Sequence, residues 1–161
     1  MENLRIGIGY DSHRFVSDKP LILGGINIPY PFGLKAHSDG DVLIHAIIDA
    51  ILGAAGLGNI GQYFPDTDQK WKNAFSIDLL RSTVDLINSQ RCKILSIDSV
   101  IITEKPKILP HIDNMKQAIE KTGINSSLIN IKAKTNEGMG FVGRQEGIAA
   151  MATCLLIKPS G

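Results

Sequence analysis

The sequence predicts an α+β fold in which one main mixed sheet carries helices on a single face. Segments typical of strands stand at both ends of the chain, segments with apolar residues at helical spacing lie between them, and several strand segments are long. With 161 residues and 43% hydrophobic composition, the chain can bury one core. We therefore expect a single catalytic domain that spans residues 1–161.

Four segments have the composition of principal strands, and a fifth predicts a hairpin because two short apolar runs flank a Gly-Gly pair. The strand segments are 4–15, 94–103, 128–135 and 148–157, and the hairpin segment is 21–29. Val100, Ile101 and Ile102 form a continuous apolar run. We expect the second strand to be buried on both faces at this run.

Three segments have apolar residues at helical spacing, namely 38–55, 75–90 and 111–121. The first helix should begin at Ser38 or Asp39, since either side chain can cap a helix N-terminus. It should end near Ala55, because several glycines follow. Loops are expected in the polar or glycine-rich stretches 33–40, 62–72 and 138–147.

Charge and composition exclude several classes of protein. Seventeen basic and sixteen acidic residues give a net charge of +1, so no global field attracts nucleic acid or an anionic membrane. No apolar stretch approaches the ~20 residues of a membrane span, and no targeting segment is recognisable. Cys92 and Cys154 lack the spacing of a metal or redox motif, which is typical of reduced structural thiols. We expect a cytoplasmic protein without nucleic-acid or membrane partners.

Three of the four histidines lie within residues 13–45. Asp11 and His13 are two residues apart, so on a strand their side chains share one face. With His45 they form a set of two imidazoles and one carboxylate, an open three-ligand site for zinc whose fourth position a substrate can occupy. This pattern predicts a metal enzyme. Asp49, one helical turn after His45, either orients that imidazole as a second-shell partner or is a solvated surface carboxylate.

A second polar group lies on later loops and strand ends: Lys105, Lys107, Lys134, Thr135, Asn136, Glu137 and Arg144. Ammonium groups, hydroxyls and backbone amides beside a divalent metal stabilise phosphate charge, which favours phosphoryl chemistry. Each feature also has a structural alternative. A lone histidine such as His111 is more often structural, and the glycine-rich stretch matches no nucleotide-binding fingerprint.

Six motifs follow one another along the whole chain. They are GYDSH at 9–13, LGGI at 23–26, AHSDGDV at 36–42 with His45-Ala46, GNIG at 58–61 with FPDTD at 64–68, KPKILPH at 105–111, and KAKTNE at 132–137 with GFVGRQEG at 140–147. Together they resemble the 2-C-methyl-D-erythritol 2,4-cyclodiphosphate synthases, a family of phosphorus–oxygen lyases in the non-mevalonate isoprenoid pathway.

The resemblance implies a reaction and its metals. The 2-phosphate of 4-diphosphocytidyl-2-C-methyl-D-erythritol 2-phosphate attacks the β-phosphate of its own diphosphate, CMP leaves, and a cyclic diphosphate forms. The implied zinc ligands are Asp11, His13 and His45. Glu137 corresponds to the residue that holds a second divalent ion, Mg²⁺ or Mn²⁺. The catalytic positions His37 and Thr135 line the reacting phosphates.

The resemblance also implies binding residues. Those for the substrate are Ser38, Asn59, Ile60, Gly61, Phe64, Pro65, Asp66, Thr67, Asp68, Phe141 and Arg144, of which 59–61 and 64–68 match the erythritol-binding and lid-like segments. Those for the nucleotide are Thr103, Glu104, Lys105, Pro106, Lys107, Ile108, Leu109, Ala133 and Lys134. Two positions depart from the family pattern. Asn59 stands where many members have aspartate, with a slight effect expected, and Lys134 replaces a hydroxyl residue and adds positive charge near the diphosphate.

The family is homotrimeric, and each active site takes its metal group from one subunit and its nucleotide pocket from the next. Trimerisation should bury apolar strand faces around a three-fold axis. Arg144 and Glu146 either lie at an axial cavity that binds an isoprenoid diphosphate or form only a structural ion pair. Two other functions stay open: a zinc phosphoesterase that uses metal-bound water, and a non-enzymatic binding module stapled by zinc.

Overall fold

The computed structural model describes residues 2–159. Its main sheet has five strands in the order β4-β1-β7-β5-β6, and β2 and β3 form a separate hairpin. The strands are β1 Glu2–Val16, β2 Leu21–Leu23, β3 Ile26–Ile28, β4 Gly33–Leu34, β5 Lys93–Ile102, β6 Ile129–Lys134 and β7 Gly147–Pro159. Neighbours in the main sheet are antiparallel except β5 and β6, which are parallel. The predicted α+β class with one mixed main sheet is confirmed.

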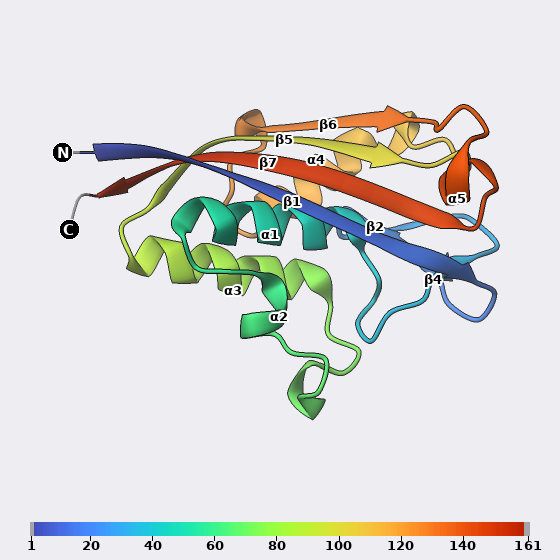
Figure 1. The fold of residues 1–161 in the computed structure, drawn as a ribbon, viewed down its shortest axis with the longest axis horizontal. Helices are drawn as coiled ribbons and strands as arrows, with labels where there is room; N and C mark the ends of the chain where they lie inside the picture. The colour runs from blue at the N-terminus through green and yellow to red at the C-terminus, as the bar shows by residue number, and fades with distance from the viewer. Residues whose placement is uncertain (1, 160–161) are drawn as a thin grey trace.

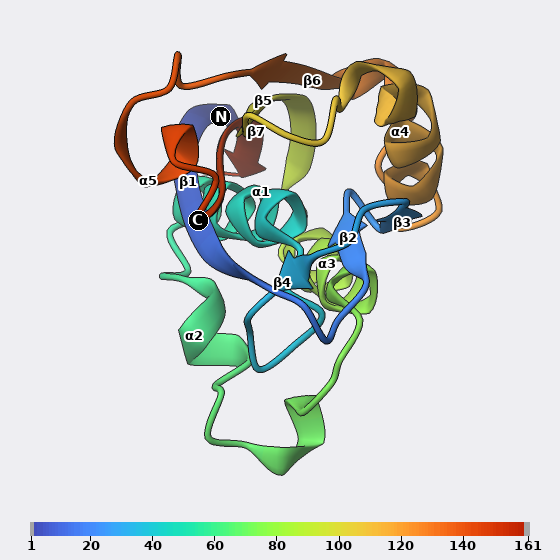
Figure 2. The ribbon, with the colours of Figure 1, turned by 90° about the vertical axis from the view of Figure 1, so that its right-hand side faces the viewer.

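The helices are α1 Val42–Ala55, α2 Ile60–Tyr63, α3 Ser76–Ser89, α4 Ile112–Glu120 and α5 Gly140–Gly143. Single 3₁₀ turns cover Gln69–Trp71, Leu109–His111 and Ser126–Leu128. Figure 1 shows α1 packed beneath β1 and β7, with α3 below it. Figure 2 shows α4 on the same side of the sheet, beside the β2–β3 hairpin. Within residues 2–159, no helix is long and apolar enough to cross a membrane.

The centre of the core is α1, which is sandwiched between the sheet and α3. All of its residues are buried except His45, Asp49 and Gly53. These three lie four residues apart, so they form one stripe along the helix. That stripe is where α1 can present polar side chains without disturbing its apolar packing.

Asp41 caps the N-terminus of α1, so the prediction of Ser38 or Asp39 as the cap was wrong. Its fully buried carboxylate accepts hydrogen bonds from the N–H groups of Ile44 at 3.1 Å, Gly24 at 3.0 Å and Gly25 at 2.7 Å. Burial raises its pKa to about 6, against the lowering effect of the Gly25 and Ile44 N–H donors. Asp41 is the cap because the N–H groups of Gly24 and Gly25 in the β2–β3 hairpin also bind its carboxylate. These glycines lie 17 and 16 residues before it, so helix-capping rules alone could not identify Asp41.

Strand β1 lies directly against α1 because two of its inward positions are glycines. A Cβ on Gly9 would lie 1.9 Å from the carbonyl oxygen of Ala46, and one on Gly7 would lie 2.1 Å from that of Ala50. No side chain fits in these gaps. The close approach brings the first turn of α1, which carries His45, to the end of β1.

The opposite face of the sheet is uncovered in the single chain. Leu4, Ile6, Ile8 and Tyr10 of β1 are 66%, 75%, 65% and 53% exposed. On β5 burial alternates, since Ile101 is buried while Val100 and Ile102 are only half-buried. Within one chain, the prediction that this strand is buried on both faces is therefore wrong.

The other long elements confirm the predicted strands, hairpin and helices. Three predicted loops, however, contain short elements: β4 in 33–40, the end of α2 and a 3₁₀ turn in 62–72, and α5 in 138–147. β4 forms only by pairing with Phe15 and Val16 of β1. A four-residue helix is too short to show a hydrophobic period, so composition alone suggested loops.

Candidate metal centre and active site

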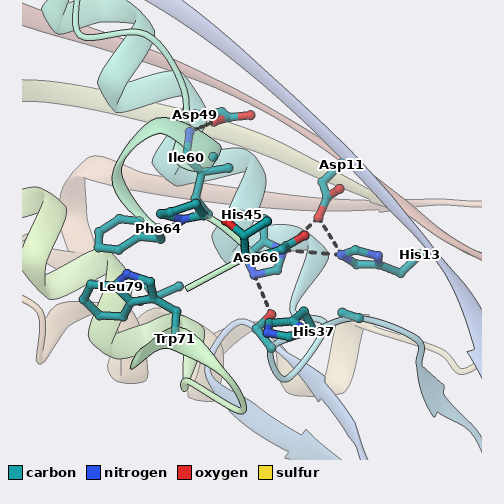
Figure 3. A pocket seen from close by; sticks show the side chains of 15 residues that line it. Asp11, His13, His37, His45, Asp49, Ile60, Phe64, Asp66, Trp71 and Leu79 are labelled. Carbon is teal, nitrogen blue, oxygen red and sulfur yellow. Dashed lines mark hydrogen bonds and ion pairs between the residues drawn. The ribbon is translucent and has the colours of Figure 1, made fainter. Parts of the chain in front are cut away.

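Strand β1 and helix α1 bring three metal-binding side chains to one point. Asp11 and His13 share the face of β1 that meets α1, and His45 comes from the first turn of α1. Asp11 Oδ2 lies 2.9 Å from His13 Nε2 and 2.8 Å from His45 Nδ1, and the two nitrogens are 3.4 Å apart (Figure 3). The convergence predicted from their spacing is confirmed.

Electrostatics keep Asp11 ionised at this point. Burial alone would raise its pKa, but the hydrogen bonds and charges of His13 and His45 lower it to about 2. For His45, burial lowers the pKa, and the bond to Asp11 and nearby carboxylate charge more than offset this, so the pKa lies above its usual 6.5. One carboxylate oxygen and two ring nitrogens, all within 4.8 Å of one another, are a donor set that fits a divalent metal such as zinc.

A cavity of about 350 Å³ opens beside this group. Its lining includes the predicted residues Ser38, Ile60, Gly61, Phe64, Pro65, Asp66 and Thr67. Trp71 and Leu79 complete an apolar wall, in which the Phe64 and Trp71 rings meet edge to face with centroids 5.0 Å apart. A ligand held here would contact the metal group on one side and this wall on the other.

Two predicted residues do not border this cavity, although their chain neighbours do. Asn59 stands at the start of α2, where its N–H donates to Gln62 Oε1 at 2.9 Å. Asp68 Oδ1 accepts from the N–H of Lys70 at 2.9 Å and so caps the 3₁₀ turn that carries Trp71. In this structure the backbone of Asn59 and the side chain of Asp68 hold the segments that line the cavity.

His37 borders the same cavity with an unsatisfied donor or acceptor. Among the described residues, its Nε2 is buried and has no hydrogen-bond partner. Buried polar atoms are nearly always paired, so an orphan at a cavity wall indicates a place for a ligand atom. A phosphate oxygen would satisfy this nitrogen if it carries its proton.

Asp49 does not hydrogen-bond to His45. Its Oδ1 accepts from the N–H of Ile60 at 2.7 Å, and burial raises its pKa. His45 has other partners at both ring nitrogens: Nδ1 faces Asp11, and Nε2 lies 2.8 Å from Ser76 Oγ. The structure thus gives Asp49 the task of fixing α2 at the cavity edge. Sequence reasoning missed Ser76, which lies 31 residues from His45.

A second cavity of about 270 Å³ lies where β5 and β6 end. It is lined by Thr103, Glu104, Pro106, Lys107, Ile108, Leu109, Pro110, Ala133, Lys134 and Thr135. All residues predicted for the nucleotide therefore border it except Lys105. The two cavities share no lining residue.

The turn after β6 carries Glu137, the predicted holder of a second metal. Thr135 Oγ1 donates to Glu137 Oε1 at 3.3 Å. Glu104 Oε1 accepts from the N–H groups of Asn136 at 2.8 Å and Gly138 at 3.3 Å. Glu104 thereby fixes the turn, a task that its position before Lys105-Pro106 did not indicate.

The glycine-rich segment contains an ion pair between Arg144 Nε and Glu146 Oε1, 2.8 Å apart and exposed to solvent. Phe141 is 38% exposed. Neither Phe141 nor Arg144 borders either of the two cavities. The ion pair that the sequence left as one alternative is therefore present, and the ligand role of Arg144 stays a prediction.

Comparison with known proteins places the chain in a family. The sequence model of the YgbB family matches residues 4–157. The chain belongs to the YgbB family. A 2-C-methyl-D-erythritol 2,4-cyclodiphosphate synthase of Clostridium botulinum (strain Kyoto / Type A2) is 55% identical over 154 residues, which are 95% of this chain and 99% of that protein.

Solved structures share the fold of this YgbB-family chain over nearly its whole length. The bifunctional IspDF of Campylobacter jejuni matches 99% of the chain with a TM-score of 0.93 and 42% identity, and the match covers 44% of that larger protein. A 2C-methyl-D-erythritol-2,4-cyclodiphosphate synthase in a CDP-bound form matches 94% of the chain with a TM-score of 0.85 and 38% identity, covering 99% of that chain.

Proposed function

We propose that this YgbB-family chain converts 4-diphosphocytidyl-2-C-methyl-D-erythritol 2-phosphate to 2-C-methyl-D-erythritol 2,4-cyclodiphosphate and CMP in non-mevalonate isoprenoid biosynthesis. The observation that carries the proposal is the open group of Asp11, His13 and His45 beside a cavity, in a chain 55% identical to a named synthase. This group would hold zinc, and Glu137 would hold Mg²⁺ or Mn²⁺.

When bound, the metals supply positive charge that neutralises phosphate oxygens. The protein's own residues then have to position the substrate. His37 Nε2, the orphan nitrogen of the first cavity, would donate to a reacting phosphate, and the Thr135 hydroxyl would do the same from the end of β6. Nucleophile and electrophile belong to one molecule, so positioning and charge neutralisation suffice without a covalent enzyme intermediate.

The two cavities would divide the substrate between them. Ser38 and the segment 60–67 would hold the erythritol phosphate in the first, beside the apolar wall of Phe64 and Trp71. The second, at the ends of β5 and β6, would hold the cytidine and its phosphates. The CDP in the structure of a related synthase supports a cytidine nucleotide as this chain's ligand too.

We further propose a homotrimer in which each active site combines the first cavity of one subunit with the second cavity of its neighbour. Two observations support it: the cavities share no residue, and β1 exposes an apolar row from Leu4 to Tyr10. An isoprenoid diphosphate bound by Arg144 near the axis is a further proposal. Calorimetry with farnesyl diphosphate that records no heat of binding would remove it.

The deciding experiment is incubation with the cytidylyl substrate, with and without a metal chelator, followed by phosphorus NMR. We expect cyclic diphosphate and CMP to form without chelator and not to form when the chelator is present. An opened phosphate product would indicate the phosphoesterase instead. His13→Ala should abolish turnover and leave a folded protein, whereas unfolding of that variant would favour a zinc staple. Against the staple, the group found within residues 2–159 offers three ligands, where a closed structural zinc site has four.

A further inference from the structure

The far side of the His45 ring is held by a buried serine. Nδ1 of His45 points toward Asp11 and His13, where the metal of the proposed function would be held. Nε2 lies 2.8 Å from the hydroxyl of Ser76, the first residue of α3. Ser76 has no exposed surface, so water does not compete for this contact.

Asp39 holds Ser76 from the other side through both carboxylate oxygens. The Ser76 hydroxyl hydrogen-bonds to Asp39 Oδ1, and the Ser76 N–H donates to Oδ2 at 2.9 Å. An ionised carboxylate can only accept, so the single hydroxyl proton of Ser76 is directed to Asp39. The oxygen of Ser76 is then left to accept a proton from His45.

The direction of these hydrogen bonds fixes which nitrogen of His45 faces the metal site. Nε2 carries the proton that Ser76 accepts, so the nitrogen left for a metal is Nδ1, whose proton in the metal-free protein is shared with Asp11. That is the nitrogen 2.8 Å from Asp11 Oδ2 and 3.4 Å from His13 Nε2. Metal-ligating histidines usually donate their second N–H to an acceptor in this way.

Ser38 is the competing partner of the same nitrogen. Its hydroxyl lies 3.2 Å from His45 Nε2 and also accepts from the N–H of Gly40 at 3.3 Å. Among the described residues, no other acceptor engages the Ser38 hydroxyl proton, so Ser38 alone could either donate to Nε2 or accept from it. The shorter contact with Ser76, whose proton is committed to Asp39, makes Nε2 the donor.

We propose that Ser76 and Asp39 are positioning residues that hold the His45 ring with Nδ1 facing the metal site. The inference rests on the metal centre of the proposed function, although not on the reaction catalysed there. It also links that centre to α3, because the carboxylate that orders Ser76 binds the N-terminal end of this helix.

Zinc affinity and the His45 tautomer test the proposal directly in the full-length protein. Ser76→Ala should weaken zinc binding by about 10- to 100-fold in competition with a chromophoric chelator. In ¹⁵N NMR of the zinc-bound wild type, the His45 ring should be protonated on Nε2 alone, and Ser76→Ala should shift the Nε2 resonance because this N–H loses its acceptor. Ser82→Ala is the matched control, since Ser82 lies exposed on the same helix and bonds only to the Asp78 carbonyl.

A double-variant measurement separates positioning from general stability. Asp39→Ala should weaken zinc binding in the same direction, and adding Ser76→Ala should then have little further effect, because both act through one chain of hydrogen bonds. Unchanged zinc affinity with a lower melting temperature of the metal-free protein would reduce Ser76 to a structural role and overturn the proposal.

The wild type alone keeps the proposal falsifiable if the variants fail to fold. Zinc bound to His45 through Nε2 instead of Nδ1 in the wild type would overturn it. If the wild type bound no zinc, both the metal centre and this inference would be contradicted. If it bound zinc with His45 protonated on Nε2 but made no cyclic diphosphate, only the proposed function would be contradicted.

Discussion

At the scale of single residues, Asp11 carries the electrostatics of the metal-free site. Its pKa of about 2 lies below the unfolded value of 3.8, so the ionised form stabilises the fold above about pH 4 and this contribution is lost as the pH falls toward 2. The pKa of His45 is raised above 6.5, so its contribution is present below pH 6.5 and is lost as the pH rises through the folded pKa.

These two shifts predict a stability window in the metal-free protein. The difference in unfolding free energy between wild type and Asp11→Asn should be largest between about pH 4 and pH 6.5, on the order of 1–2 kcal/mol. It should shrink on both sides of that window. Urea unfolding from pH 3 to pH 8 in the presence of chelator measures it, and a pH-independent difference would contradict the argument.

Lys134 places a positive charge beside the cavity that we propose for the nucleotide. It is exposed at the end of β6 and borders the second cavity. Lys134→Thr should raise KM several-fold at low salt with little change in kcat, and the difference should fade as salt rises, because an exposed charge is screened. Lys116→Thr, on α4 away from that lining, is the control. Equal KM values at low ionic strength would show that the charge does not contact the substrate.

The sequence predicted those site residues whose grouping follows from strand or helix geometry within one segment or from residue type. Asp11 and His13 could be paired because a strand has a period of two, and His45 stood out by residue type. Ser76 and Asp39 could not be paired with His45, because their contacts depend on where α3 packs. The orienting role expected of Asp49 had correct helical spacing, but Ile60 takes up its carboxylate.

At the scale of elements, the contact between β1 and α1 determines whether the site assembles. Gly9→Ala would place a Cβ 1.9 Å from the Ala46 carbonyl, so strand and helix must separate. We expect a loss of several kcal/mol in stability, comparable to overpacking a core, together with weaker zinc binding as His45 moves away from Asp11. Urea unfolding and zinc titration measure the two effects.

Gly53 supplies the matched control on the same contact. A Cβ at Gly53 would lie 3.8 Å from its nearest neighbour, Gly7 Cα, which is ordinary contact. Gly53→Ala should leave zinc affinity unchanged and raise stability by up to about 1 kcal/mol, because alanine favours the helix. If both variants were equally stable, the close approach of β1 and α1 would not limit the substitution at Gly9.

Element prediction succeeded where a pattern extends over several turns or alternations. The long strands and helices α1, α3 and α4 carry such patterns. The two residues of β4 acquire their structure only from β1, and the single turns of α2 and α5 from local hydrogen bonds such as Phe64 N–H to Ile60 O at 2.9 Å. No periodicity can report elements of that length.

At the scale of the whole molecule, the uncovered sheet face and the separate cavities require a common explanation. A row of exposed apolar side chains on a five-stranded sheet is typical of an interaction surface. The proposed trimer covers it and also brings the metal group of one subunit to the nucleotide pocket of the next. Within one chain, Val100 and Ile102 of β5 are only half-buried, and the proposed trimer would cover them.

Subunit mixing tests this arrangement most directly. His13→Ala removes a metal ligand, and Ala133→Trp fills the second cavity, so each variant alone should be inactive. A trimer that contains both variants has one complete site. That site combines the intact metal group of an Ala133→Trp subunit with the intact pocket of a His13→Ala subunit. Refolding an equal mixture from denaturant should therefore restore about a quarter of wild-type activity, because about three quarters of random trimers hold one complete site in three. Mixing without denaturation is the control.

The opposite outcome would be refolded mixtures that stay inactive although both variants sediment as trimers in analytical ultracentrifugation. Each active site would then have to lie within a single chain.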